Sequence, residues 1–491
     1  MFTLLKKKLR SSAAACVVMF AGLPVFMAST TVNATTLTFE TIVLEGDQGP
    51  GALAGSSFSF VGRPSLNNQG EIAFETILTG AGITGANDSA IFSDVGGTLS
   101  LVAREGDAAP GAGAGVSFTR VSGLSLNDQG EIAFRAGLTG TGVDGTNNTA
   151  IFSDVGGTLS LVAREGDAAP GAGAGVSLSV NGFPSLNNQG GLAFQSSLRG
   201  EGVTLDNSVA IFRESGGNLS LVAREGDAAP GAGAGEVFSL FLGSPVLNDQ
   251  GETAFLSFIR GSVLNSNNDT ALFSDVGGTL SLVAREGDAA PGARGARFGD
   301  FNGLAFDLND QGEIAFVTRL TGTNDDAIFS DVGGTLSLVA REGDAAPGAG
   351  DGVFFRDFGG NTGSVRLNNQ SEIAFVSILQ GTGVTFANDT AIFSGSNGML
   401  SLLVREGDII DLGNGDLANI IALSIGAPVV LNDLGEVAFF ADLSDGRSGL
   451  FLASPDGVVV SPVPIPAALP LMASGLLGLV AIARRRKSAL S

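Results

Sequence analysis

The residues best able to do chemistry in this chain are carboxylates that recur in one short motif. Arg-Glu-Gly-Asp occurs repeatedly, and a related Leu-Glu-Gly-Asp stands first, at 44–47. Each copy places a Glu and an Asp close together in a Gly-rich segment. Oxygen-rich loops of this kind can bind Ca²⁺, which takes about six to eight oxygen ligands. The candidate ligands are Glu105, Asp107, Glu165, Asp167, Glu225 and Asp227.

A structural interpretation of the same motif is also open, and we favour it. Arg104 would pair with a neighbouring carboxylate while Gly106 and Asp107 form a turn, as Gly and Asp commonly do. The spacing does not match the alternating carboxylates of an EF-hand loop. No cofactor is therefore predicted, apart from calcium, which remains an alternative.

The composition leaves few groups for catalysis. The chain has no His, Trp or Tyr, its single Cys is Cys16, and every Lys lies in a terminal segment. The body of the chain therefore lacks most general bases, thiol nucleophiles and zinc ligands. Hydrolysis of glycosides by two carboxylates is the main chemistry that remains. Asp206 and Glu214 break the repeat pattern, but nothing else marks them as such a pair.

Charge and aromatic content limit the partners. The net charge is −23 and the cations cluster at the ends, so the body should repel DNA and other polyanions. No nucleic acid is therefore expected as a partner. Glycan binding is disfavoured by the absence of Trp and Tyr, and the 33 Phe are more simply interpreted as core residues.

Internal repetition positions these carboxylates. The motif Asn-x-x-Gly-x-x-Ala-Phe recurs in units of about 60 residues. In one copy, at Asn368, Ser371 replaces the Gly. The other copies begin at Asn67, Asn127, Asn187, Asn248, Asn309 and Asn432.

One unit, 116–167, predicts four strands. Apolar and β-branched runs cover 116–126, 130–138, 149–155 and 158–164, and turn-forming residues separate them. Asn127 and Gly130 suit the first and fourth positions of a type I turn. No stretch of the repeats keeps a helical apolar period, so the fold class is all-β.

Seven such units predict a seven-bladed β-propeller of four-stranded repeats. The segment 37–47 resembles an isolated fourth strand, and the last unit reaches only its third strand before the tail. We therefore expect the N-terminal strand to complete the last blade and cover its edge. A β-solenoid or a row of small β modules are the alternatives.

The predicted propeller has two different faces. The short NDQG and VGG turns would lie on one face, and the REGD loops would lie on the other with the variable links at 80–89 and 200–208. Because binding usually resides in variable loops on a rigid scaffold, we expect it on the REGD face.

The two ends of the chain are predicted to be sorting signals. Residues 1–34 have a basic start, an apolar run and a small-residue cleavage site between Ala34 and Thr35, as in a secretory signal peptide. Residues 462–491 contain an apolar stretch near the lower length limit for crossing a bilayer, followed by an Arg cluster expected to remain cytoplasmic. The repeat domain between them is 35–461. The residues of the C-terminal motif are Val463, Pro464, Pro466, Ala467, Arg484, Arg485 and Arg486.

The tail resembles the PEP-CTERM sorting signals, in the VPxPA variant that exosortases process. The repeats resemble the tandem-repeat surface proteins that carry the NxxGxxAF motif. The first resemblance implies an exosortase-type processing enzyme as a partner and membrane insertion before processing. It also implies export across the inner membrane of a Gram-negative bacterium, to the cell surface or the medium, often alongside exopolysaccharide production.

These features lead to one expected function and two alternatives. The leading hypothesis is a non-enzymatic protein with a structural or interaction role in the envelope or exopolysaccharide matrix, where an envelope protein or a matrix polysaccharide would be its partner. The alternatives are a carboxylate-dependent glycan hydrolase or lyase and a calcium-dependent adhesin.

Overall fold

The computed structural model describes residues 37–455, except 302–304, 324, 359–364, 397, 414 and 424–428. The described residues, from Leu37 to Pro455, belong to one compact unit. The predicted signal peptide with Ala34 and Thr35 lies outside the described residues, as does the C-terminal segment 462–491 with its motif. Within the described part, we find no helix with the length and apolarity needed to cross a membrane.

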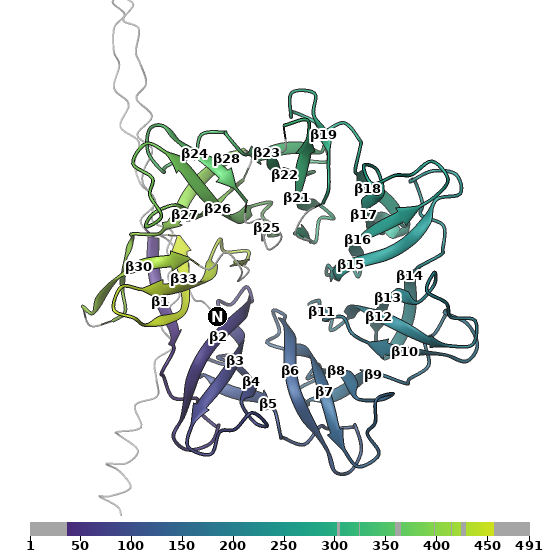
Figure 1. Cartoon of the computed structure of the whole chain (residues 1–491). Helices are drawn as coiled ribbons and strands as arrows, with labels where there is room; N and C mark the ends of the chain where they lie inside the picture. The colour runs from purple at the N-terminus through teal and green to yellow at the C-terminus, as the bar shows by residue number, and fades with distance from the viewer. Residues whose placement is uncertain are drawn as a thin grey trace, which may run out of the picture. The chain divides into compact units, whose positions relative to one another are not determined.

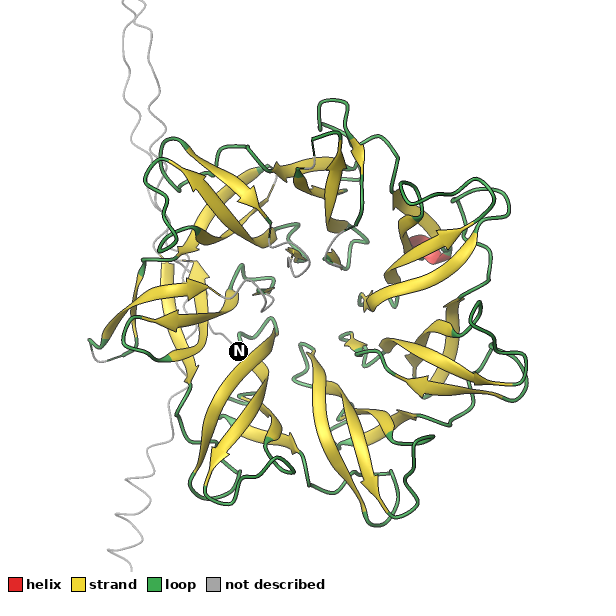
Figure 2. Ribbon diagram, viewed as in Figure 1, coloured by secondary structure: helices red, strands yellow, loops and turns green. Residues whose placement is uncertain are grey.

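The described residues form seven antiparallel sheets arranged as blades around a ring (Figure 1). Strands make up almost all of their regular structure (Figure 2). Blades 1 and 2 are β2 (Ser56–Leu66), β3 (Ile72–Gly80), β4 (Ser89–Ser93), β5 (Ser100–Arg104) and β6 (Val116–Leu126), β7 (Ile132–Gly140), β8 (Thr149–Ser153), β9 (Ser160–Arg164). Blade 3 is β10 (Val176–Val180), β11 (Ser185–Leu186), β12 (Leu192–Gly200), β13 (Val209–Ser215) and β14 (Asn218–Arg224).

The remaining blades follow the same order. Blade 4 is β15 (Val237–Leu247), β16 (Thr253–Arg260), β17 (Thr270–Ser274), the 3₁₀ turn η1 (Val276–Gly278) and β18 (Ser281–Arg285). Blade 5 is β19 (Arg297–Phe298), β20 (Phe306–Leu308), β21 (Ile314–Thr321), β22 (Asp326–Ser330) and β23 (Ser337–Arg341). Blade 6 is β24 (Val353–Asp357), β25 (Val365–Leu367), β26 (Ile373–Gly381), β27 (Thr390–Ser396) and β28 (Met399–Arg405). Blade 7 is β29 (Ile409–Asp411), β30 (Leu417–Leu423), β31 (Val430–Leu431), β32 (Val437–Leu443), β33 (Ser448–Pro455) and the N-terminal β1 (Leu37–Leu44).

The N-terminal strand closes the ring. β1 pairs antiparallel with β33, from Leu37 opposite Pro455 to Leu44 opposite Gly449. Val43 of β1 is buried in the core that blade 7 shares with blade 1. The predicted seven-bladed propeller closed by its first strand is therefore confirmed, and the solenoid and the row of modules are excluded.

The hydrophobic core lies between neighbouring blades. Ala73 and Ile91 of blade 1 pack in one cluster with residues of blade 2, and the other junctions repeat this arrangement. In blade 2 the Phe118 and Phe152 rings meet edge to face, 5.0 Å apart, and Phe134 stacks on Phe152. Burying each Phe side chain stabilises the fold by about 1.5–3 kcal/mol. The recurring Phe residues therefore form the blade core, as the sequence pattern predicts.

The NxxG turns gather around the centre of the ring (Figure 1). Asn127 Oδ1 accepts hydrogen bonds from Gln129 N and Glu131 N, which shapes the predicted turn. Asn127 Nδ2 reaches the Asn187 carbonyl oxygen of the next blade at 3.1 Å. The same bond joins every pair of neighbouring blades, and Asn432 closes the circle on the Asn67 carbonyl oxygen.

The two faces of the propeller are as predicted. On one face, Gly96 N of the VGG turn donates to Glu71 Oε1 of the NxxG turn, so both turns lie together. On the other face, Ser208 N of the link between the second and third strands donates to Glu225 Oε2 of the REGD loop. We call these the turn face and the loop face.

Candidate functional site

The Asp of each REGD motif closes a turn on its own Arg. Asp107 N donates to the Arg104 carbonyl oxygen at 3.1 Å, and Arg104 Nη2 pairs with Asp107 Oδ1 at 3.0 Å. Gly106 between them has a φ of +88°, in the left-handed region that favours glycine. The backbone turn recurs at Asp167 and Asp227. The predicted turn and Arg–carboxylate pair are therefore confirmed at this position.

In other copies the Arg fastens two loops together. Arg164 Nη1 donates to the Ala112 carbonyl oxygen at 2.9 Å, and its Nε donates to the Asn147 carbonyl oxygen at 2.7 Å. One arginine therefore holds the AAPGAGAG loop and the link between the second and third strands in a fixed relation. The equivalent bonds are made by Arg224, Arg285 and Arg405.

The Glu of each motif points to the junction between blades instead. Glu225 is buried, and its Oε2 accepts from Ser208 N at 2.8 Å and Val209 N at 2.9 Å. Glu165 is also buried; its Oε2 accepts from Thr149 Oγ1 at 3.2 Å, and its Oε1 pairs with Arg199 at 2.8 Å. These carboxylates therefore anchor the first residues of the third strand.

At the first junction the Glu has a charged neighbour of each sign. Partial burial, together with Asp88, raises the pKa of Glu105, and Arg120 acts against them. The Glu and the Asp of one motif thus make different contacts, and the structure does not bring the six candidate calcium ligands together as pairs.

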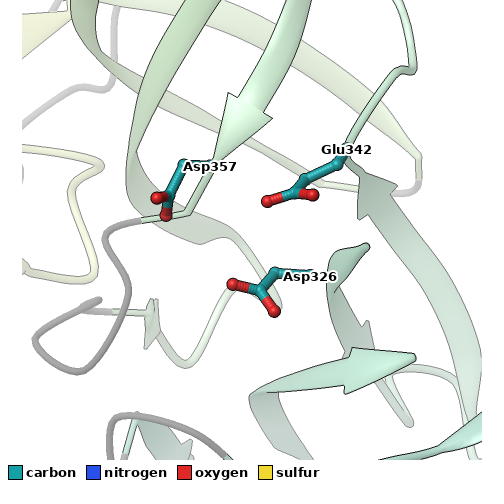
Figure 3. A group of neighbouring side chains, drawn as sticks. All are labelled: Asp326, Glu342 and Asp357. Carbon is teal, nitrogen blue, oxygen red and sulfur yellow. The ribbon is translucent and has the colours of Figure 1, made fainter. Parts of the chain in front are cut away.

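A carboxylate cluster does form at the junction of blades 5 and 6 (Figure 3). Asp326 opens β22, Glu342 follows β23, and Asp357 ends β24 of the next blade. Their nearest carboxylate oxygens all lie within 4.8 Å of one another. Among the described residues this is the group whose geometry can hold a metal ion, and it includes none of the six predicted ligands.

Repulsion within this cluster is only partly compensated. Burial, followed by the charges of Asp326 and Asp357, raises the pKa of Glu342 to about 7. Burial also raises the pKa of Asp326, while Arg319 Nε donates to Asp326 Oδ1 at 3.1 Å. Oxygen donors without nitrogen or sulfur suit a hard cation such as Ca²⁺ rather than Zn²⁺.

The neighbouring junction has a related arrangement. Burial raises the pKa of Glu286 to about 7, and Asp269 and Asp300 add to the effect. Acidic groups are therefore concentrated on the loop face where blades 4, 5 and 6 meet.

Sequence reasoning missed this cluster, although a signal for it exists. Asp326 departs from the repeat, because the position before the Ala-Ile-Phe motif carries an uncharged residue in the other units. These residues include Ser89, Thr149, Val209, Thr270 and Thr390. Of the departures singled out instead, Asp206 precedes β13 and Glu214 lies within β13, near its C-terminal end. Asp206 pairs with Arg260, and Glu214 Oε1 accepts from Gly217 N in a turn, so the two carboxylates form no common site.

Four of the links between the second and third strands, in blades 1, 2, 3 and 6, are held by the same two internal hydrogen bonds. In the first, Asn87 Oδ1 accepts from Thr84 N at 2.7 Å and Asn87 Nδ2 donates to the Gly82 carbonyl oxygen. The same pair of bonds recurs at Asn147, Asn207 and Asn388.

These fastened loops present different residues at their tips. The tip is Gly85 in the first loop and Gly145 in the second, but Leu205 in the third and Phe386 in the sixth. Leu205 is 94% exposed and Phe386 is 91% exposed. The loop face therefore has constant supports that carry variable side chains.

A family model described as a family of unknown function, DUF7453, matches residues 25–466. No curated protein matches the sequence.

Several solved structures are similar in shape at low sequence identity. An oligogalacturonate lyase in complex with manganese is 14% identical, with 86% of this chain and 97% of that chain covered and a TM-score of 0.42. The polysaccharide lyase Uly1 is 10% identical, with 85% and 98% covered and a TM-score of 0.43. The β-propeller domain of the Trilobed protease from Pyrococcus furiosus is 7% identical, with 82% and 96% covered and a TM-score of 0.44.

Proposed function

We propose that this chain, which belongs to the DUF7453 family of unknown function, is an exported, non-enzymatic propeller that binds a partner in the envelope or the exopolysaccharide matrix through its loop face. The observation that carries the proposal is the set of loops with identical fastenings and variable tips. A rigid support with variable exposed residues is typical of a recognition surface.

The use of the repeated carboxylates supports a non-enzymatic role. Asp107 and Asp167 shape turns, while Glu165 and Glu225 accept hydrogen bonds from strand residues. A glycosidase needs two carboxylates with different tasks beside a substrate. Because these groups are committed to structural contacts, they are poorly suited to proton transfer.

Export through the predicted terminal signals fits the position of the closing strand. Cleavage between Ala34 and Thr35 would leave a mature chain that enters β1 almost at once, at Leu37. The predicted exosortase-type enzyme would act near Pro464 to Ala467, beyond the last described strand, β33, which ends at Pro455.

The test is binding of the purified protein to envelope fractions and to matrix polysaccharide from the producing bacterium. Changing Leu205 and Phe386 together to Ser should reduce binding at least tenfold, because both side chains are exposed at loop tips. Val155, which is 37% exposed in a turn-face loop, supplies the control V155S. Unchanged binding by the tip variant would refute the role of the tips, and polysaccharide cleavage would favour the hydrolase or lyase alternative.

A calcium-dependent adhesin is the second candidate, because the cluster of Asp326, Glu342 and Asp357 has the donors that Ca²⁺ prefers. Millimolar Ca²⁺ should then raise the melting temperature of the protein but not of D326N. An equal effect of Ca²⁺ on both proteins, or none on either, would exclude calcium binding at this cluster.

A further inference from the structure

The residue that follows each motif Asn forms a second ring around the axis. The backbone N–H of each member donates to the side-chain Oδ1 of the next, at 2.6–2.8 Å, and the last returns to the first. The ring therefore closes on itself, as the ring of motif Asn residues does. In order, its members are Asn68, Asp128, Asn188, Asp249, Asp310, Asn369 and Asp433.

Amides and carboxylates alternate around most of this ring. Asn68 Nδ2 donates to Oδ2 of Asp128 and of Asp433, both at 2.8 Å. Asn188 bridges Asp128 and Asp249 in the same way, at 2.8 and 2.7 Å. Each amide thus supplies the hydrogen bonds that two neighbouring carboxylates need.

Alternation cannot be completed in a ring with an odd number of members. The mismatch falls between Asp249 and Asp310, where two carboxylates adjoin with no amide between them. Asp249 N donates to Asp310 Oδ1 at 2.7 Å, and the two side chains are within hydrogen-bonding reach. Burial, with the charge of Asp249, raises the pKa of Asp310, although the hydrogen bonds that Asp310 accepts from Asp249 N and from Asn369 act in the opposite direction.

Charged groups on the packed turns and strands are engaged elsewhere. Neither Asp249 nor Asp310 forms an ion pair with any residue in the described part of the chain. Three neighbouring carboxylates accept hydrogen bonds from other groups: Glu252 from Asn248 Nδ2 and Gly277 N, Glu313 from Asn309 Nδ2 and Ser371 Oγ, and Asp307 from Leu367 N. Two neighbouring arginines donate to other groups: Arg213 to Asp275 and the Gly251 carbonyl oxygen, and Arg366 to the Val365 carbonyl oxygen.

We propose that the Asp249–Asp310 junction is a proton-binding site, in which one shared proton takes the place of the missing amide and strengthens the closure of the ring as the pH falls. The proton comes from solvent, forms an O–H bond on one carboxylate and is donated to the other. Protonation removes one negative charge and supplies the hydrogen bond that the amides make elsewhere in the ring. This proposal does not depend on the proposed function.

Counting the protons released on unfolding tests the proposal. At about pH 5 the unfolded carboxyl is mostly ionised, so unfolding of the native protein should release more protons than unfolding of D310N, with one additional proton as the upper limit. Calorimetric unfolding in buffers of different ionisation enthalpy, with EDTA present, measures this number. D249N removes the same pair and should show the same loss, which keeps the test valid if one variant does not fold.

D128N is the matched control, because it removes a ring carboxylate but leaves Asp249 and Asp310 together. It should be less stable, since two amides lose their acceptor, but release as many protons as the native protein. Equal proton release by D310N, D249N and the native protein would overturn the proposal. So would a loss in D128N as large as that in D310N.

Hydrogen exchange provides a measurement on the unmodified protein. After correction for intrinsic rates, protection of the Asp249 amide should fall as the pH rises from 5 to 8. Loss of the shared proton leaves two adjacent ionised carboxylates, and their repulsion opens the junction, which outweighs the stronger acceptor that ionised Asp310 offers this amide. Protection of the Asp128 amide, which donates to Asn188, should stay constant. If added Ca²⁺ restored protection of the Asp249 amide at pH 8, a metal ion rather than a proton would occupy the junction, and the proposal would be wrong.

Discussion

Replacing Asn127 by Ala tests whether the NxxG motif holds neighbouring blades together. Its Oδ1 accepts from Gln129 N at 3.1 Å and Glu131 N at 2.9 Å. Its Nδ2 donates to Glu131 Oε2 at 2.9 Å and to the Asn187 carbonyl oxygen at 3.1 Å. At a net value near 1 kcal/mol for each bond, N127A should lower the free energy of unfolding by about 4 kcal/mol.

Asn432 provides the matched variant, because its side chain makes the corresponding bonds. Its Oδ1 accepts from Leu434 N and Glu436 N, and its Nδ2 donates to Glu436 Oε2. The remaining bond, to the Asn67 carbonyl oxygen at 3.0 Å, joins the last blade to the first. In a closed ring N432A should therefore destabilise the protein as much as N127A, within about 0.5 kcal/mol.

The assay is urea unfolding followed by circular dichroism, with the slope of the transition as a check on the denatured state. A value for N432A at least 1 kcal/mol smaller than that for N127A would show that the Asn432–Asn67 bond contributes nothing, and the ring would be open at the axis. A small effect of both variants would refute the fastening role of the motif.

Three further predictions follow from packing and charge. At Gly130, with a φ of +75°, an added Cβ would lie 2.5 Å from Val95 Cγ1, whereas at Gly251, with a φ of +77°, it would meet nothing within 4 Å. In urea unfolding, G130A should therefore lower the free energy of unfolding by about 1–3 kcal/mol more than G251A. Adding V95A should cancel the difference. Deleting 37–45 should destabilise all blades in one cooperative transition by limited proteolysis and circular dichroism; melting of the first repeat alone would contradict the shared closure. Because the pKa of Glu342 is raised to about 7, its protonation favours the folded state below pH 7. With EDTA present, the free energy of unfolding of the native protein should fall by about 1–2 kcal/mol relative to E342Q as the pH rises from 5 to 8, after allowance for solvent screening. Parallel stability curves for the two proteins would refute this.

Much of the fold could be predicted because each unit carries its own strand and turn signals. The run 116–126 and the turn at Asn127 to Gly130 correspond to β6 and the turn after it. The role of β1 was also predictable, since 37–47 has the pattern of a fourth strand without the first three. These are local patterns, and their order along the chain is enough to place them.

The candidate sites depend on contacts that local patterns do not contain. Asp326 and Asp357 belong to different blades, and only the packing of β22 against the end of β24 brings them beside Glu342. The Asp249–Asp310 pair arises only because the ring closes and has an odd number of members, so that Asn and Asp cannot alternate throughout. The REGD carboxylates were visible in the sequence, but which of them point to the junction and which to the turn depends on the backbone.

The pairing of Leu37 with Pro455 has a consequence for the proposed anchoring of the protein at a cell surface. Both residues lie at the turn-face end of blade 7, because β33 runs from the loop face to the turn face and ends at Pro455 beside Gly435 of an NxxG turn. A tether attached after Pro455 would thus pull on the turn face. The bacterial surface would lie behind the propeller, and the tips carrying Leu205 and Phe386 would be directed outward, toward whatever approaches the cell.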